Sequence, residues 1–293
     1  MTRELKIGVC GLGSIGRGIA LSLLRHGFDV HCYDPVPATM QTVVAAGAVQ
    51  ASSVETLARV SDVFVVAVVN EEQVRQVVLD DNAAPRKFPH RAVVVCCSTV
   101  SKEFVENLGH SLSSTGVDLL DAPVSGGTER AHRGELTVYL SGPNDAVKRT
   151  KPAFDAFATA VFRVGDAPGA GSAVKLVNQM LAAGNLAVAS EAVVVAEKLG
   201  LNPEALRDII AASAGNSWMF QNVLTGLIEP ERPTRSAISI FLKDMKIAMG
   251  VCDQISLDVP VSREVVQLMS AAASADYGSK DASFLVDYLR DRT

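Results

Sequence analysis

Short, strongly apolar runs alternate with amphipathic segments through the first half of the chain. The runs indicate strands at residues 5–10, 30–33, 63–69, 93–97, 118–121, 136–140 and 161–164. The amphipathic segments indicate helices at residues 14–26, 39–46, 54–60, 72–79 and 102–113. The runs at 63–69 and 93–97 are apolar throughout, which is typical of strands covered on both faces in a parallel sheet. This alternation predicts an α/β fold with a doubly wound sheet.

After residue 165 the strand pattern stops and apolar residues recur at helical spacing. Residues 172–199 contain no proline and only one glycine, Gly184, which predicts one helix of about 28 residues. Further helices are predicted at 203–214, 218–227, 237–254, 262–275 and 282–289. The chain therefore divides into an α/β domain, 1–165, and an all-α domain, 166–293, joined through a long interdomain helix. Because so apolar a helix needs cover, we expect a homo-oligomer, either a dimer or a tetramer.

A glycine-rich turn follows the first predicted strand and opens the first helix. In GLGSIG, Gly11 permits a tight turn, Gly13 lets the backbone approach a pyrophosphate, and Gly16 lets the helix pack on the strand. The helix N-terminus, with Ser14 and Ile15, attracts the phosphate groups. The motif in this context predicts a Rossmann-type domain that binds a dinucleotide.

Asp34 lies at the end of the second predicted strand, 23 positions after Gly11. A carboxylate there accepts hydrogen bonds from the ribose 2′-hydroxyl and repels a 2′-phosphate. No arginine follows in DPVPATM, so the sequence predicts NAD rather than NADP. The alternative is that Asp34 caps the next helix.

Three further strand ends carry residues suited to ligand binding, because ligands of doubly wound sheets lie at the carboxyl ends of the strands. They are Val68, Val69 and Asn70 after one strand, Ser98 and Thr99 after the next, and Ser125, Gly126 and Gly127 after Asp121. The last group offers a hydroxyl and consecutive backbone N–H groups, a concavity suited to a carboxylate. Each group is equally compatible with an ordinary turn.

Lysine is the candidate for proton transfer, because all five histidines lie in the first half and no cluster has metal-ligand spacing. On the long helix, Lys175, Asn178, Gln179 and Asn185 share one face. Desolvation of a lysine favours its neutral form and moves its pKa towards the range for general acid–base work. The alternative is a lysine whose ammonium group reaches water.

Five motifs occur in a characteristic order: GLGSIG, STV, DAPVSGG, GAGSAVKLVN and FLKD. With them the sequence resembles, over essentially its full length, the β-hydroxyacid dehydrogenase family, which includes 3-hydroxyisobutyrate dehydrogenase and tartronate semialdehyde reductase. The resemblance implies that Lys175 is the catalytic acid/base and that Ser125, Gly126 and Gly127 bind the substrate carboxylate. It also implies that Asn178 positions the substrate. The glycines of GAG are expected to form a hinge into the long helix.

The resemblance also implies cofactor contacts, from Thr99 and from Lys243, which would close over the nicotinamide. This sequence departs from the family pattern at two places. Where the family usually has LP after the fourth strand, this sequence has VVN, and where the family has NN on the long helix, this sequence has Asn178-Gln179. VVNEEQVRQV and AGNSWMFQN look like the L-threonate dehydrogenase branch, which implies oxidation of a four-carbon polyhydroxy acid next to its carboxylate. Trp218 would then line the pocket, or else pack in the helical core.

Three alternatives remain open at this stage. Two are related activities: a tartronate semialdehyde or succinic semialdehyde reductase, and a 3-hydroxyisobutyrate dehydrogenase. The third is a non-catalytic scaffold that binds a dinucleotide.

Composition narrows the partners and the compartment. The net charge is −5 with no long basic run, so nucleic acid and anionic membranes are unexpected partners. No apolar run is expected to reach transmembrane length. The five cysteines show no CxxC spacing, which favours reduced, buried thiols in a cytoplasmic protein.

Overall fold

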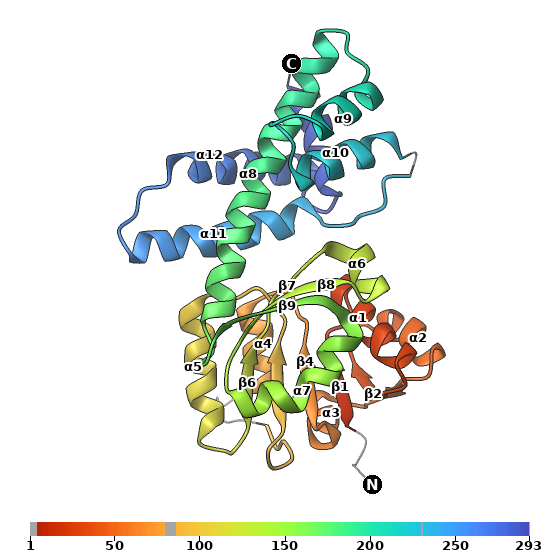
Figure 1. Cartoon of the computed structure of the whole chain (residues 1–293), viewed down its shortest axis with the longest axis vertical. Coiled ribbons are helices and arrows are strands. Elements are labelled where there is room, and N and C mark those ends of the chain that lie inside the picture. The colour runs from red at the N-terminus through yellow and green to blue at the C-terminus, as the bar shows by residue number, and fades with distance from the viewer. Residues whose placement is uncertain (1–4, 80–85, 230, 293) are drawn as a thin grey trace. The chain divides into compact units, whose positions relative to one another are not determined.

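The computed structural model describes residues 5–79, 86–229 and 231–292 (Figure 1). The chain forms two compact units, Met1–Lys175 and Leu176–Thr293. The first unit holds a nine-stranded sheet with helices on both faces, and the second is built from helices. The predicted fold class is therefore confirmed.

The sheet of the first unit is mostly parallel. Its strands are β1 (Lys6–Cys10), β2 (Asp29–Tyr33), β3 (Val49–Gln50), β4 (Val63–Val66), β5 (Val93–Cys96), β6 (Asp118–Asp121), β7 (Val124–Ser125), β8 (Leu136–Ser141) and β9 (Ala158–Gly165). Their order is β3-β2-β1-β4-β5-β6-β8-β7, with β9 paired to β8, and only the β6–β8 and β7–β8 pairs are antiparallel. The chain direction across the sheet reverses between β1 and β4, which is the switch point at which such sheets bind ligands.

Both faces of this sheet are buried. In β4, Val63 and Val65 belong to one apolar cluster, whereas Phe64 and Val66 belong to another. Helices α1 (Ser14–Arg25), α2 (Pro37–Ala45) and α7 (Asn144–Phe157) pack into the first cluster (Figure 1). Helices α3 (Val54–Val60), α4 (Glu71–Val78) and α5 (Lys102–Ser113) pack into the second. Because side chains alternate along a strand, a strand that is apolar throughout can supply both cores.

The second unit has its own apolar core. It comprises most of α8 (Ala170–Lys198), with α9 (Pro203–Ala211), α10 (Trp218–Ile228), α11 (Ile238–Gln254), α12 (Pro260–Ala272) and α13 (Leu285–Arg290). A π-helical turn, Ala273–Tyr277, and a 3₁₀ turn, Ala282–Phe284, connect the last two helices. Leu186 of α8, Val223 of α10 and Met245 of α11 are fully buried in this core.

Helix α8 is long and apolar enough, by length and composition alone, to cross a membrane, with a window of mean hydropathy 1.4. The expectation that no apolar run reaches such a length was wrong, because alanine and valine raise the hydropathy of this 29-residue helix. Half of that window is buried within the structure, and core helices of soluble proteins meet the same criterion. Length and hydropathy are thus weak indications of a membrane span here.

Candidate active site

The three glycines of the first turn have three different environments. Gly11 has φ +88°, a backbone conformation that favours glycine, and its N–H donates to the Tyr33 carbonyl at 3.1 Å. A Cβ on Gly16 would lie 1.9 Å from the Gly11 carbonyl oxygen. A Cβ on Gly13 would meet no atom within 4 Å. The fold itself therefore requires Gly11 and Gly16, whereas Gly13 keeps a space clear beside the turn.

Helix α1 begins at this cleared space without a side-chain cap. Gly13 is its N-cap residue and makes no side-chain hydrogen bond to the first turn. The backbone N–H groups of Ser14, Ile15 and Gly16 occupy the positions of α1 that lack a helical acceptor. Such N–H groups, together with the positive end of the helix dipole, fit a pyrophosphate.

Asp34, at the end of β2, is buried and fixes the glycine-rich turn. Its Oδ2 accepts the Leu12 N–H at 2.7 Å, and its Oδ1 accepts the Val36 N–H at 2.9 Å. The N-cap residue of α2 is Val36, so the alternative that Asp34 caps this helix does not hold. Each carboxylate oxygen retains acceptor capacity beyond its one backbone donor.

Hydrogen bonds connect the segment after β4 to the segment after β5. Ser98 is buried, and its hydroxyl donates to the Val68 carbonyl at 2.8 Å and lies 3.1 Å from the Val68 N–H. Asn70 caps α4 by accepting the Gln73 N–H, while Gln73 Oε1 accepts the Val69 N–H. Asn70 thus has a structural role that the sequence did not indicate. Thr99 is half-buried just beyond Ser98.

The SGG segment turns β7 directly into a short helix, α6 (Gly127–Arg133). Ser125 ends β7 and is half-buried. Gly126 and Gly127 have φ +134° and +70°, conformations that L-residues with a Cβ rarely adopt. The two glycines are therefore required by the turn.

Lys175 lies near the start of α8 and is only 7% exposed. Most of its side chain is therefore withdrawn from water. The GAG segment before it leads directly into α8. Gly169 has φ +119°, and a Cβ on Gly171 would lie 2.4 Å from the Tyr139 carbonyl oxygen, so close packing fixes the start of α8.

The remaining predicted residues belong to the helical unit. Asn178 donates to Gln179 Oε1 at 3.2 Å, and the buried Gln179 donates to Asp244 Oδ2 at 2.6 Å. Lys243 Nζ lies 2.6 Å from the other oxygen of Asp244. Trp218 is 61% exposed at the start of α10, so it does not pack in the helical core. Exposure leaves it available to a ligand or to another surface.

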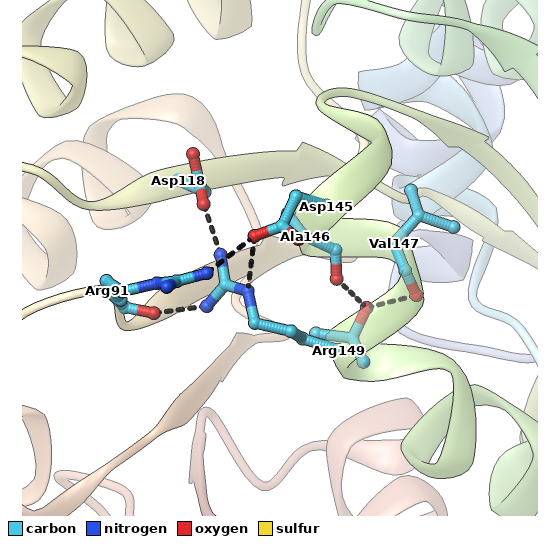
Figure 2. Close-up of polar contacts among 7 residues, drawn as sticks. Arg91, Asp118, Asp145, Ala146, Val147 and Arg149 are labelled. Atoms are coloured by element: carbon cyan, nitrogen blue, oxygen red, sulfur yellow. Dashed lines mark hydrogen bonds and ion pairs between the residues drawn. The ribbon is translucent and has the colours of Figure 1, made fainter.

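A cavity of about 250 Å³ lies elsewhere in the first unit, at the amino ends of β4 and β5, with Val63 and Val93 in its wall. Figure 2 shows the charges beside it: Arg149 pairs with Asp118 and Asp145, and Arg91 pairs with Asp145 at 2.8 Å. Ligands of doubly wound sheets bind at the opposite, carboxyl ends. The mutually paired charges of this cluster serve to join β6 to α7.

The thiols and the metal-ligating side chains indicate no second chemistry in the described residues. All five cysteines are buried and free, as the sequence indicated. Burial, reinforced by the Asp34 carboxylate, raises the pKa of Cys10 to about 12, so this thiol stays protonated at neutral pH. Over the ranges that the structure describes, no three or more His, Cys, Asp or Glu side chains form a group able to hold a metal ion.

Two buried carboxylates were not predicted from the sequence. Asp121 ends β6 and bonds the start of α8, and Asp244 joins α8 to α11. Both stand inside motifs that were singled out for their neighbours, DAPVSGG and FLKD. The sequence did contain a signal for these carboxylates, namely an acidic residue at the end of an apolar strand or on a buried helix face. Such a residue indicates a specific contact, because buried charges need specific partners.

Two known protein families match this chain. The family described as the NAD binding domain of 6-phosphogluconate dehydrogenase matches residues 6–165. The family described as NAD-binding of NADP-dependent 3-hydroxyisobutyrate dehydrogenase matches residues 169–289. These two matches cover nearly the whole chain.

Several similar individual proteins are named dehydrogenases. An L-threonate dehydrogenase of Cupriavidus necator is 39% identical over 280 residues, covering 96% of this chain and 94% of the relative. One from Escherichia coli K12 is 33% identical, covering 97% and 94%. A crystal structure of 3-hydroxyisobutyrate dehydrogenase from Salmonella typhimurium is 36% identical, with TM-score 0.89 and coverage of 97% and 99%. The chain therefore belongs to the β-hydroxyacid dehydrogenase family, the NAD-binding oxidoreductases of the 3-hydroxyisobutyrate dehydrogenase type.

Proposed function

We propose that this enzyme oxidises L-threonate to its 2-oxo acid with NAD and with Lys175 as the general acid/base. The observation that carries the proposal is the buried lysine of GAGSAVKLVN in a chain 39% identical to a named L-threonate dehydrogenase. Other hydroxy acids of similar size are the alternatives, because relatives in this family have different named substrates.

The proposed chemistry requires one proton acceptor from the chain. Oxidation of the alcohol breaks a C–H bond and an O–H bond and forms a carbonyl group. NAD, when bound, supplies the acceptor for the hydride. The neutral amine of Lys175 takes the hydroxyl proton and later releases it to water. In the reverse direction the ammonium group returns the proton to the alkoxide oxygen.

The chain also offers groups to orient the acid. The hydroxyl of Ser125 and the N–H groups of Gly126 and Gly127 would bind the substrate carboxylate. The positive φ values of the two glycines support this role, because turns of this kind can direct successive N–H groups at an anion. Asn178 would donate to a substrate hydroxyl. The exposed Trp218 would cover the substrate. The substrate carboxylate is bonded to the reacting carbon. Binding this carboxylate at the SGG segment would therefore also hold the reacting carbon at a set distance from Lys175.

For the cofactor, we propose that the N–H groups at the start of α1 bind the pyrophosphate and that Asp34 accepts from the ribose hydroxyls. Gly13 would then leave room for the phosphates. The other proposed contacts are Val68, Val69, Asn70, Thr99 and Lys243. The buried carboxylate of Asp34 would repel a 2′-phosphate, which favours NAD over NADP.

The decisive test is Lys175→Ala. Without the amine, kcat should fall by about 10²–10⁴-fold, the usual contribution of general acid–base catalysis, while NADH affinity stays close to that of the wild type. The two quantities are measured by steady-state kinetics and by NADH fluorescence titration. Near-normal turnover in this variant would contradict the proposed mechanism.

Asp34→Ala tests the cofactor preference. Removing the carboxylate should lower the ratio of kcat/KM with NAD to kcat/KM with NADP by about tenfold, equivalent to about 1.4 kcal/mol. An unchanged ratio would mean that Asp34 only fixes the glycine-rich turn through Leu12 and Val36.

A substrate panel distinguishes the related activities. L-threonate, 3-hydroxyisobutyrate, D-glycerate and 4-hydroxybutyrate are assayed with NAD, and L-threonate should give the highest kcat/KM. If another acid is preferred, that acid becomes the proposed substrate. The proposed role of Lys175 is not affected by this outcome. Tight NADH binding without oxidation of any acid would instead favour the non-catalytic scaffold.

A further inference from the structure

Asp121 is a fully buried carboxylate to which the proposed chemistry gives no role. Its Oδ2 accepts the N–H groups of Gly169 and Ser172, each at 2.9 Å. Its Oδ1 accepts the Ser172 hydroxyl at 2.7 Å, and Ser141 Oγ lies 3.1 Å from Oδ2. The carboxylate therefore bonds the start of α8 through several donors.

The direction of the Ser141 hydrogen bond follows from its second partner. Ser141 Oγ accepts the Gly171 N–H at 3.0 Å, so its own hydrogen is free to point at Asp121. All four partners of Asp121 are thus donors, an arrangement that an ionised carboxylate satisfies best. Burial raises the pKa of this carboxyl, and the four donors act against that rise.

These bonds replace the missing helical acceptors at the start of α8. The N–H groups of Gly169 and Ser172 donate to Asp121, and that of Gly171 donates to Ser141. Lys175 follows Ser172 by less than one turn of the same helix. In the other direction along the chain, Asp121 stands four residues before Ser125, at the base of the SGG segment.

We propose that Asp121 is a positioning residue, which fixes the first turn of α8 on the end of β6 and so holds Lys175 at a set place relative to the SGG segment. The inference rests on the proposed role of Lys175 as the proton acceptor. Asp121 itself touches neither substrate nor cofactor in this scheme. Its effect is on geometry, and a misplacement of about 1 Å can cost about 10²-fold in rate.

The test compares Asp121→Asn, Ser141→Ala and a control, Asp118→Asn. The asparagine keeps one acceptor oxygen but turns an NH₂ group towards donors, which loosens the start of α8. Ser141→Ala removes the hydroxyl that links the Gly171 N–H to the carboxylate. Asp118 lies at the opposite end of the same strand and pairs with Arg149 (Figure 2). It is therefore an aspartate on the same strand as Asp121, but it does not contact the start of α8.

We expect kcat to fall by about 10- to 100-fold in Asp121→Asn and by a smaller factor in Ser141→Ala. NADH affinity should be unchanged in both, and amide hydrogen exchange should quicken only at the start of α8. Asp118→Asn should retain the wild-type kcat. If Asp121→Asn does not fold, Ser141→Ala decides: a lowered kcat with normal NADH binding supports the inference, and a wild-type kcat overturns it.

Two results overturn the inference and leave the proposed function standing. One is wild-type kcat in Asp121→Asn while Lys175→Ala is inactive. The other is a parallel loss of kcat, NADH affinity and thermal stability in Asp121→Asn, which would indicate support of the fold alone. Normal turnover in Lys175→Ala would instead overturn the proposed role of the lysine and this inference with it.

Discussion

Among single residues, the glycines of the first turn separate folding from ligand binding. Gly16 faces the Gly11 carbonyl oxygen so closely that a methyl group cannot fit, whereas Gly13 faces open space. The fold does not require glycine at position 13, and we propose that the cofactor does. On this proposal the same motif contains one glycine that supports the chain and one that serves the dinucleotide.

Alanine at these two positions should have opposite effects. Gly16→Ala should lower the free energy of unfolding by at least about 1–3 kcal/mol, the usual cost of overpacking, as measured by urea denaturation. Gly13→Ala should fold normally but weaken NADH binding by about tenfold, measured by fluorescence titration. Equal NADH affinity in Gly13→Ala and the wild type would show that the cofactor does not approach this residue.

Spacing along the chain predicts some of these residue positions and not others. The positions of Gly11, Gly16 and Asp34 could be predicted, because spacing along the chain fixes them relative to the first two strands. The four hydrogen bonds of Asp121 could not, because its partners lie 20 to 51 positions away in sequence. Such bonds form only when the sheet brings β6, β8 and the start of α8 together.

Among elements, the apolar strands were predicted closely and the short or polar elements were missed. The prediction for residues 118–121 matches β6, and that for 54–60 matches α3. Strands β3 and β7 have two residues each, too few for a periodic pattern. Helix α7 was missed because it is rich in charged residues and carries Pro152 in its interior. Hydrophobic periodicity detects elements that are long enough to show a repeat.

A polar contact joins α8 and α11 inside an apolar core. Asp244 is almost fully buried, receives the Gln179 amide at 2.6 Å and pairs with Lys243. A buried carboxylate is stable only with such partners. The contact therefore fixes which faces of α8 and α11 meet. It also orients Gln179 and Asp244, which are the chain neighbours of the predicted ligand-binding residues Asn178 and Lys243.

Removing this carboxylate should destabilise the helical unit. Asp244→Ala removes the carboxylate that accepts the buried Gln179 amide and pairs with Lys243, so the free energy of unfolding should fall by about 3 kcal/mol. Urea denaturation followed by circular dichroism measures the change. Asp253→Ala, on the exposed side of the same helix, removes a surface ion pair with Arg263 and should have a far smaller effect. Equal losses in the two variants would contradict a special role for Asp244.

For the whole molecule, the informative surface is a row of apolar side chains along α8. Leu181, Val188 and Val195 are 64%, 63% and 57% exposed and are spaced seven residues apart. A repeat of seven is the spacing at which one helix presents a continuous seam to another. Within the described chain this seam has no cover, and we propose that the homo-oligomer expected from the sequence buries it.

Charges on this seam should therefore separate the subunits. In the double variant Leu181→Lys and Val188→Lys, lysines would face one another across a two-fold interface, where burial and like-charge repulsion both oppose association. The mass in solution, measured by sedimentation equilibrium, should fall from a multiple of the subunit mass of 30.9 kDa to that mass. Val261→Lys, at a residue 72% exposed on α12, is the control and should leave the mass unchanged. A double variant with the wild-type mass would assign the interface to another surface, because two buried lysines cannot be accommodated in a seam that α8 forms with its copy.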